Sequence, residues 1–92
     1  MSYKILPYSF KQADKLNVEI KPSTNKNKKI DVFQNGQKIA SIGAIGYNDK
    51  PTWTLKKGVD YANQRAKLYK ERHRKDIKVK NSNGYFADKI LW

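Results

Sequence analysis

The stretch IDVFQNGQKIASIGAIG, residues 30–46, indicates a β-hairpin and decides the fold class. Asn35-Gly36 near its centre is typical of a two-residue type I′ turn, because both turn positions need a positive φ angle that Asn and Gly adopt readily. Ile30 and Val32 lie at strand spacing before the turn. After the turn, either of two sets can face the core: Lys38, Ala40 and Ile42, or Ile39 and Ser41.

A third strand precedes the hairpin in the segment KLNVEIKP, residues 15–22. Its alternate residues are apolar, namely Leu16, Val18 and Ile20. Such alternation is typical of a strand with one buried face, and Pro22 ends the strand because proline has no N–H to donate to a neighbouring strand. A polar, basic loop over residues 23–29 joins this strand to the hairpin. We therefore expect a three-stranded antiparallel meander.

Helical periodicity begins at residue 59 and continues to about residue 75. One half of this long helix carries apolar side chains: Val59, Tyr61, Ala62, Ala66, Leu68 and Tyr69. Shorter elements are predicted over residues 85–92 (a C-terminal helix), 9–16 (one or two helical turns with Ser9 as the N-cap) and 52–55 (a short strand or a helical turn). The 92-residue chain is thus predicted to be a single α+β domain. In it, a three-stranded antiparallel meander sheet is packed by one main basic helix and the short C-terminal helix.

The charge of the chain is strongly positive, with 20 Lys and Arg against 8 Asp and Glu. A net charge of +12 favours association with polyanions: nucleic acid first, then an acidic protein or lipid headgroups. The chain has no cysteine, which excludes a disulfide framework and Cys-based metal sites or nucleophiles. It also has no apolar run long enough for a signal peptide or a membrane span. We therefore expect an intracellular protein, or a component of a particle assembled inside the cell.

Basic residues that are expected at the surface form three clusters suited to nucleic-acid phosphates. They are Lys26, Lys28 and Lys29 in the loop before the hairpin, Lys67, Lys70, Arg74 and Lys75 on the polar half of the long helix, and Lys78 and Lys80 after it. Base readout needs Arg, Asn or Gln presented to a groove, and the exposed face of this helix offers only Asn63 and Gln64. We therefore expect sequence-nonspecific binding. The alternative is that these lysines form a solvated face that keeps the protein soluble.

Arg65 and Arg72 differ from the other basic residues because both fall in the apolar half of the long helix. They are seven residues apart and project at nearly the same angle, with His73 nearby. A planar guanidinium in such a place can stack on aromatic rings and pair with a carboxylate. Two interpretations stay open: a structural brace to a carboxylate such as Asp49, which we prefer, and a phosphate pocket formed by Arg65, Arg72 and His73.

Little in the sequence indicates catalysis. His73 is the single histidine, and the acids form no D-x-D or E-x-x-H set that would bind a metal ion. The segment GAIG, residues 43–46, lacks the lysine and the following helix of a phosphate-binding loop. We therefore expect a non-enzymatic protein without a metal ion or a cofactor. A small nuclease-like activity of His73 with Arg65 and Arg72 is the enzymatic alternative.

A pattern of residues runs through the chain from the hairpin to the last residue. It consists of Asn35-Gly36, Ile42-Gly43, Gly46-Tyr47, Asp49, Arg65, Tyr69, Arg72-His73, Gly84, Ala87 and Leu91-Trp92. Its most specific parts are YKERH, residues 69–73, and ILW, residues 90–92. This pattern resembles a set of small basic proteins encoded by large double-stranded DNA viruses and some large phages. The resemblance implies a viral setting, in the host cytoplasm, the host nucleus or the virion, and no particular reaction.

These observations favour a non-enzymatic, largely sequence-nonspecific nucleic-acid-binding protein of a large DNA virus or phage, and double-stranded DNA rather than RNA is the ligand that we expect. The alternative is a virion- or capsid-associated structural protein that bridges acidic surfaces of other virion proteins. In this alternative Trp92 inserts into a partner. If Trp92 does not insert into a partner, we expect the apolar pair Leu91-Trp92 to dock into the protein's own core.

Overall fold

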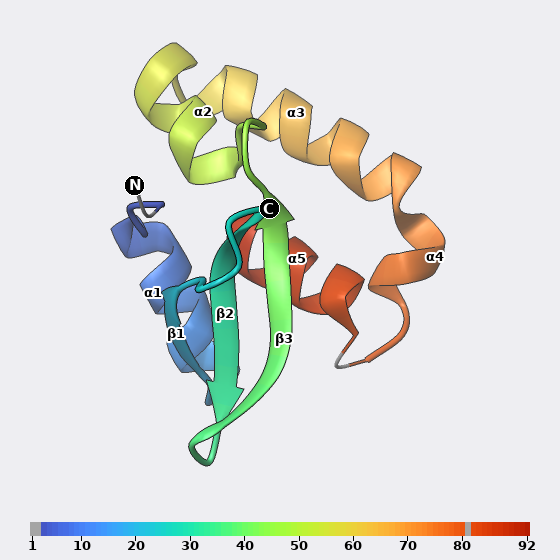
Figure 1. Ribbon diagram of the computed structural model, residues 1–92. Helices are drawn as coiled ribbons and strands as arrows, with labels where there is room; N and C mark the ends of the chain where they lie inside the picture. Colours follow the sequence, from blue (N-terminus) through green and yellow to red (C-terminus); the bar gives the residue numbers. More distant parts are fainter. Residues whose placement is uncertain (1–2, 81) are drawn as a thin grey trace.

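The centre of the protein is a three-stranded antiparallel sheet with the strand order β1-β2-β3 (Figure 1). Its strands are β1 (Glu19–Pro22), β2 (Lys28–Gln34) and β3 (Gln37–Ala44). Figure 1 draws the computed structural model, which describes residues 3–80 and 82–92 apart from the side chain of Asp76. The predicted α+β class and the antiparallel meander are confirmed.

The β2–β3 hairpin turns at Asn35 and Gly36, whose φ angles of 54° and 78° are those that a type I′ turn requires. A β-bulge at Ile39 follows the turn, because the pairing of β3 with β2 skips this residue. Beyond the bulge, Ala40 and Ile42 are buried. Of the two predicted core sets, the one that contains these two residues is therefore correct, although its lysine is exposed.

Helix α1 (Pro7–Lys15) and strand β1 have different bounds from those that the sequence indicated. α1 starts earlier than predicted, so that Ser9 lies inside the helix, where its hydroxyl donates to the Ile90 carbonyl at 3.0 Å. The prediction of Ser9 as the N-cap is therefore wrong. β1 starts only at Glu19, because the end of α1 and Asn17, with a φ angle of 58°, occupy the preceding residues.

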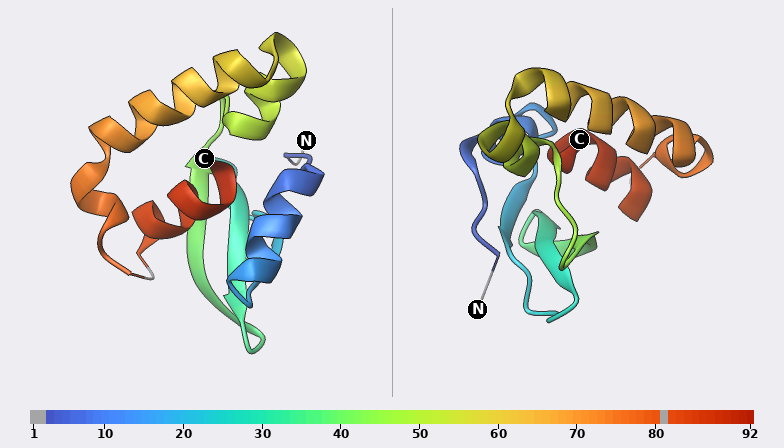
Figure 2. Two further views of the ribbon diagram at one scale, coloured as in Figure 1. Left: turned by 180° about the vertical axis from the view of Figure 1, so that it is seen from behind. Right: turned by 90° about the horizontal axis from the view of Figure 1, so that it is seen from above.

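Helices α1 and α5 (Asn83–Leu91) pack together and against the sheet, and they close the hydrophobic core (Figure 2). α5 is the predicted C-terminal helix, and the Ser82 hydroxyl caps it by accepting from the Tyr85 amide at 3.2 Å. The buried residues of the core are Ala13, Val18, Ile20, Ile30, Val32, Ala40, Ile42, Phe86, Ala87, Ile90 and Leu91. The core therefore joins the sheet to the two ends of the chain.

The remaining helices form an arm beside this core. They are α2 (Lys50–Lys57), α3 (Val59–Arg72) and α4 (Arg74–Ile77). The single long helix predicted over residues 59–75 is divided at His73, whose φ and ψ angles of −109° and 23° are not helical. Among the residues that the structure describes, no helix has both the length and the apolar character needed to span a membrane.

Helix α3 packs mainly against α2 and buries only two of its side chains, Ala62 and Ala66. Val59 and Leu68, which the helical pattern placed in the core, are 60% and 47% exposed. The sheet is instead covered by α1 and α5. The long basic helix lies beside the sheet, and Figures 1 and 2 show how it arches past α5. This arrangement leaves a cleft under the inner face of α3.

Candidate anion-binding cleft

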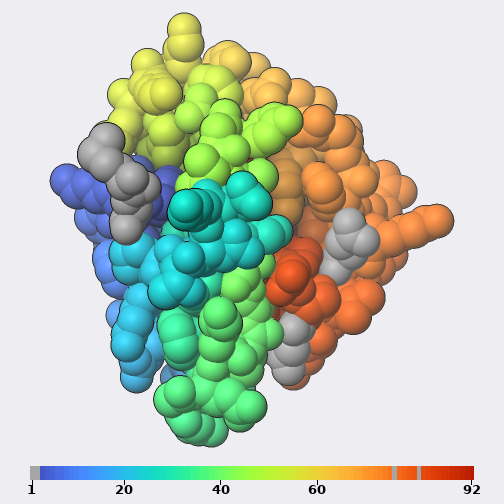
Figure 3. All heavy atoms as spheres, in the orientation of Figure 1, coloured from blue at the N-terminus to red at the C-terminus, as the bar shows by residue number. Residues whose placement is uncertain are grey.

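A cleft of about 600 Å³ lies between α3 on one side and the sheet with α5 on the other. Its charged and ionisable lining residues are Lys28, Lys29, Asp49, Arg65, Arg72 and His73. Aromatic rings also line it, namely Tyr47, Trp53, Tyr69 and Trp92. The core residues Ile42, Ala87 and Leu91 line it as well, and because they are buried they close the cleft from behind. The segments that border it, green β3, gold-to-orange α3 and red α5, come together on the face drawn in Figure 3.

Asp49 fixes one wall of the cleft. One of its oxygens accepts from the Tyr3 hydroxyl at 2.7 Å and from the Lys29 ammonium at 3.0 Å, and the other accepts from the Thr52 amide at 3.0 Å, which caps α2. Burial alone would raise the pKa of Asp49, but the hydrogen bonds from Tyr3 and Thr52 and the charge of Lys29 outweigh it and hold this pKa below its ordinary value. Asp49 is therefore an ionised structural residue.

Lys29 does not lie in the exposed basic loop where the sequence analysis placed it. It is the second residue of β2, is only 5% exposed, and donates to the Tyr47 carbonyl as well as to Asp49. A phosphate cannot reach this ammonium without breaking a buried ion pair. Of the predicted loop cluster, Lys26 is exposed and Lys28, half-buried at the start of β2, lines the cleft.

Asp31 organises the same loop from the side of the sheet. Its carboxylate accepts from the hydroxyls of Ser23 at 2.6 Å and Ser41 at 2.7 Å and from the Thr24 amide at 3.3 Å, and it lies 3.8 Å from the Lys38 ammonium. Desolvation raises the pKa of Asp31, but these hydrogen bonds and Lys38 together lower it below its ordinary value. The buried Asp31 therefore ties the β1–β2 loop to β3 and is not available to the arginines of α3.

Arg65 and Arg72 both line the cleft, as their common angle on the helix predicts. Arg65 is half-buried with its guanidinium carbon 5.5 Å from the ring centroid of Trp53, and Arg72 is exposed. Among the side chains that the structure describes, neither guanidinium forms an ion pair with a carboxylate. The preferred brace to Asp49 is therefore not formed, because Lys29 occupies that carboxylate.

His73 belongs to a stack of rings at the end of the cleft. It lies against Tyr69 with ring centroids 4.3 Å apart, and Tyr69 lies against Trp92 at 4.7 Å with the ring planes only 10° apart. Leu91 is 1% exposed. The apolar pair Leu91-Trp92 is thus docked on the protein itself, which is the second of the two possibilities that the sequence left open.

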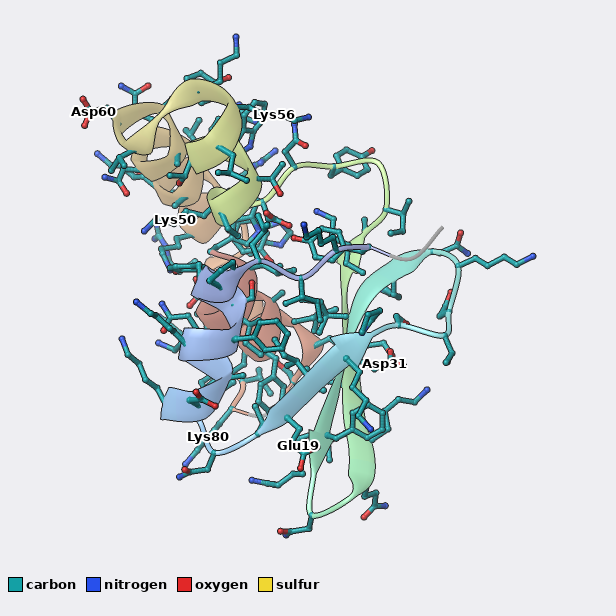
Figure 4. The ribbon with its side chains drawn as sticks, turned by 90° about the vertical axis from the view of Figure 1, so that its left-hand side faces the viewer. Glu19, Asp31, Lys50, Lys56, Asp60 and Lys80 are labelled. Carbon is teal, nitrogen blue, oxygen red and sulfur yellow. The ribbon has the colours of Figure 1, made fainter. Side chains whose placement is uncertain are left out.

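The predicted outward cations lie at the surface. Lys67, Lys70, Arg74, Lys75, Lys78 and Lys80 are all exposed. Lys70 has a structural contact too, because its ammonium pairs with the buried carboxylate of Asp88 in α5. Of the chain's 8 acids, Asp31, Asp49 and Asp88 are buried, and each of these three carboxylates has a lysine within 4.0 Å. Figure 4 shows exposed charges such as Lys56 and Asp60 projecting outward from the arm.

Several residues of the cleft were not indicated by the sequence. Trp53 was not assigned to a site, Tyr47 was named only as part of the pattern that carries the resemblance, and Tyr3, which donates to the cleft residue Asp49, was not considered. The only local signal was the Asp49-Lys50-Pro51-Thr52 sequence, in which an acid precedes a proline as it does at many helix starts. Among the described residues there is no group of three or more His, Cys, Asp or Glu that could hold a metal ion.

No protein family, curated protein or solved structure matches the chain. Most residues of the pattern that runs from Asn35 to Trp92 in the sequence nevertheless line the cleft. The cleft is lined by Gly43, Gly46, Tyr47 and Asp49 from the hairpin side, by Arg65, Tyr69, Arg72 and His73 from the arm, and by Gly84, Ala87, Leu91 and Trp92 from the last segment. The cleft therefore brings together the later part of the pattern, whereas Asn35 and Gly36 lie in the β2–β3 turn and do not line it.

Proposed function

We propose that the protein is a non-enzymatic, largely sequence-nonspecific nucleic-acid-binding protein whose ligand is double-stranded DNA. The observation that carries this proposal is a set of exposed cations in α3, in α4 and in the segment after α4, which we call the basic ridge: Lys67, Lys70, Arg74, Lys75, Lys78 and Lys80. A shallow groove beside it is lined by Lys50, Lys67, Lys70 and Arg74, with Glu71 as its one acid among the described lining residues. Such a surface can follow a phosphate backbone and release its counterions.

The viral or phage setting is proposed on the resemblance alone. The alternative of a virion protein that bridges acidic surfaces is weaker, because it relied on Trp92 as an anchor for a partner. Trp92 is half-buried and stacks on Tyr69.

A salt titration tests the proposal. If the ridge neutralises about six phosphates, the logarithm of the binding constant for a blunt duplex falls against log[salt] with a slope of about −5. The triple variant Lys67→Gln, Arg74→Gln, Lys75→Gln is expected to reduce this slope by about 3. The control removes three exposed lysines from the opposite end of the chain, Lys4→Gln, Lys11→Gln, Lys15→Gln, and changes the slope less. Lack of duplex binding at low salt, or equal losses in the two triple variants, contradicts the proposal.

A further inference from the structure

The cleft differs from the basic ridge because its positive charges lie in a partly enclosed space and not at an open surface. Among the described residues that line it, Asp49 is the only acid, and Lys29 neutralises it at 3.0 Å. Lys28, Arg65 and Arg72 therefore leave an uncompensated positive charge inside a partly enclosed space. Guanidinium groups in such a space favour a bidentate contact with phosphate oxygens, which water competes for less strongly than at an open surface.

The position of Arg65 is set by its neighbours before any ligand arrives. Its guanidinium lies over the ring of Trp53, and Trp53 in turn contacts Tyr61 with ring centroids 4.9 Å apart. Stacking on one ring face leaves the N–H groups at the edge of the guanidinium available. Arg72 starts about 10 Å further along the same side of α3, two helical turns away. The two side chains can therefore approach one anion from two directions.

The remainder of the cleft suits a flat, partly apolar group. Tyr47 lies at its rim with 75% of its surface exposed, and Trp53 and Trp92 line its walls. A volume of about 600 Å³ falls within the range of sites for single small molecules. The buried residues Ile42, Ala87 and Leu91 give the cleft an apolar floor.

We infer that the cleft binds a single nucleotide unit, with its phosphate held by Arg65 and Arg72 and its base against the aromatic rim at Tyr47. The unit has two possible sources: a free mononucleotide, or an unpaired nucleotide at the end of a nucleic-acid strand. The second source rests on the proposed function, whereas the first does not. Base stacking on an aromatic ring and phosphate contact by arginine act together in the recognition of unpaired bases.

The test uses the full chain near physiological salt, with the protein's own fluorescence and calorimetry as readouts. Both tryptophans of the chain, Trp53 and Trp92, line the cleft and report on it. Deoxyadenosine 5′-monophosphate is expected to bind about tenfold more tightly than deoxyadenosine or inorganic phosphate, because only the monophosphate uses both halves of the cleft. Equal affinities for the monophosphate and for inorganic phosphate would overturn the inference.

Substitutions assign the binding to the cleft. Arg72→Gln removes an exposed side chain and is expected to weaken the monophosphate about tenfold, because a charge-assisted hydrogen bond is lost. Tyr47→Ala is expected to weaken the monophosphate but not inorganic phosphate. The control is Lys57→Gln, which removes an equal charge from the exposed end of α2 and leaves the affinity unchanged. Equal weakening by Arg72→Gln and Lys57→Gln would overturn the inference.

A second pair of probes separates the two sources. A duplex with a short deoxyadenosine overhang is compared with the blunt duplex, in the parent protein and in Arg72→Gln. A preference for the overhang that Arg72→Gln abolishes assigns the site to strand ends. If neither duplex binds but the monophosphate binds through Arg72, the inference stands and the proposed function fails. The inference fails if the monophosphate does not bind and the overhang gives no preference.

Discussion

The ammonium of Lys29 lies 3.0 Å from the carboxylate of Asp49, and the two residues are only 5% and 1% exposed. This ion pair joins β2 to the start of α2, and Lys29 also holds the Tyr47 carbonyl in the turn between them. The pair therefore fixes the position of the whole arm relative to the sheet. It also occupies Asp49, the one carboxylate among the described residues that line the cleft, so this carboxylate does not pair with Arg65 or Arg72.

Asp49→Asn is expected to destabilise the protein by about 3–5 kcal/mol, because it leaves the Lys29 charge buried without a counterion. Asparagine still caps a helix well, so the loss reports mainly on the ion pair. Urea denaturation followed by far-UV circular dichroism measures the change. Asp60→Asn removes an equal charge at the exposed start of α3 and serves as the control. A cost no greater than that of the control shows that the ion pair is not structural.

Acid is expected to unfold the protein through Asp49 and Asp31, whose pKa values lie below the ordinary value of 3.8. The unfolded chain binds protons at a higher pH than the folded chain does, so stability rises with pH through this range. The stabilisation is complete above the unfolded pKa and is lost as the pH falls through the folded values. The urea midpoint is expected to be nearly constant from about pH 7 to 5 and to fall below about pH 4. Asp31→Asn is expected to make the fall of the urea midpoint below about pH 4 less steep. An unchanged fall in this variant would show that Asp31 does not cause the loss of stability in acid.

At alkaline pH the relevant group is Tyr3. Burial, together with the hydrogen bond to Asp49 and its negative charge, raises the pKa of this phenol well above its ordinary value of 10.0. Because the folded state keeps the proton to a higher pH, its stability is full below about pH 10 and is lost as the pH rises further. Tyr3→Phe is expected to shrink this alkaline loss. Tyr61→Phe, at a more exposed ring, leaves it unchanged; equal behaviour of the two variants argues against Tyr3.

Gly43 is predicted to be less replaceable than the turn residue Gly36. Both have positive φ angles, 79° and 78°. A Cβ atom at Gly43 would lie 2.8 Å from Leu91 Cδ1 and 3.0 Å from Lys29 Cδ, whereas a Cβ at Gly36 meets no atom within 4 Å. Gly36→Ala is thus expected to cost about 1 kcal/mol for the backbone alone, and Gly43→Ala about 2–4 kcal/mol with the overpacking added. Equal urea midpoints would show that β3 shifts to make room.

The elements that depend mainly on the residues of their own segment were predicted well. The Asn35-Gly36 turn and the strand on either side of it follow from backbone geometry, and α5 follows from its apolar residues. The pattern of α3 was misleading, because Val59 and Leu68 have core-like side chains but are exposed, and the buried residues of α3 are the small Ala62 and Ala66. Helical periodicity shows which residues share a face, but not what that face packs against.

The cleft was predictable only in part. The common angle of Arg65 and Arg72 follows from their spacing, and the structure places both in the cleft. The partner of Asp49 does not follow, because it depends on the direction in which the turn after β3 leads the chain back to β2. The residues that precede Lys29 in the sequence are polar, as in an exposed loop. The burial of Lys29 and Asp31 on the second face of β2 becomes visible only in the three-dimensional fold.

Lys70 is expected to contribute more to stability and less to DNA binding than its neighbour Lys67. Its ammonium pairs with Asp88, which is 3% exposed, although the lysine side chain itself is 48% exposed. Lys70→Gln is therefore expected to lower the free energy of unfolding by about 1 kcal/mol, a value reduced for solvent screening. Lys67→Gln leaves this free energy unchanged but reduces the slope of the DNA salt titration by about 0.9. Lys70→Gln reduces that slope less, because its charge is already partly neutralised by Asp88. The reverse order of the two slopes would place Lys70 at the phosphates and make its contact with Asp88 incidental.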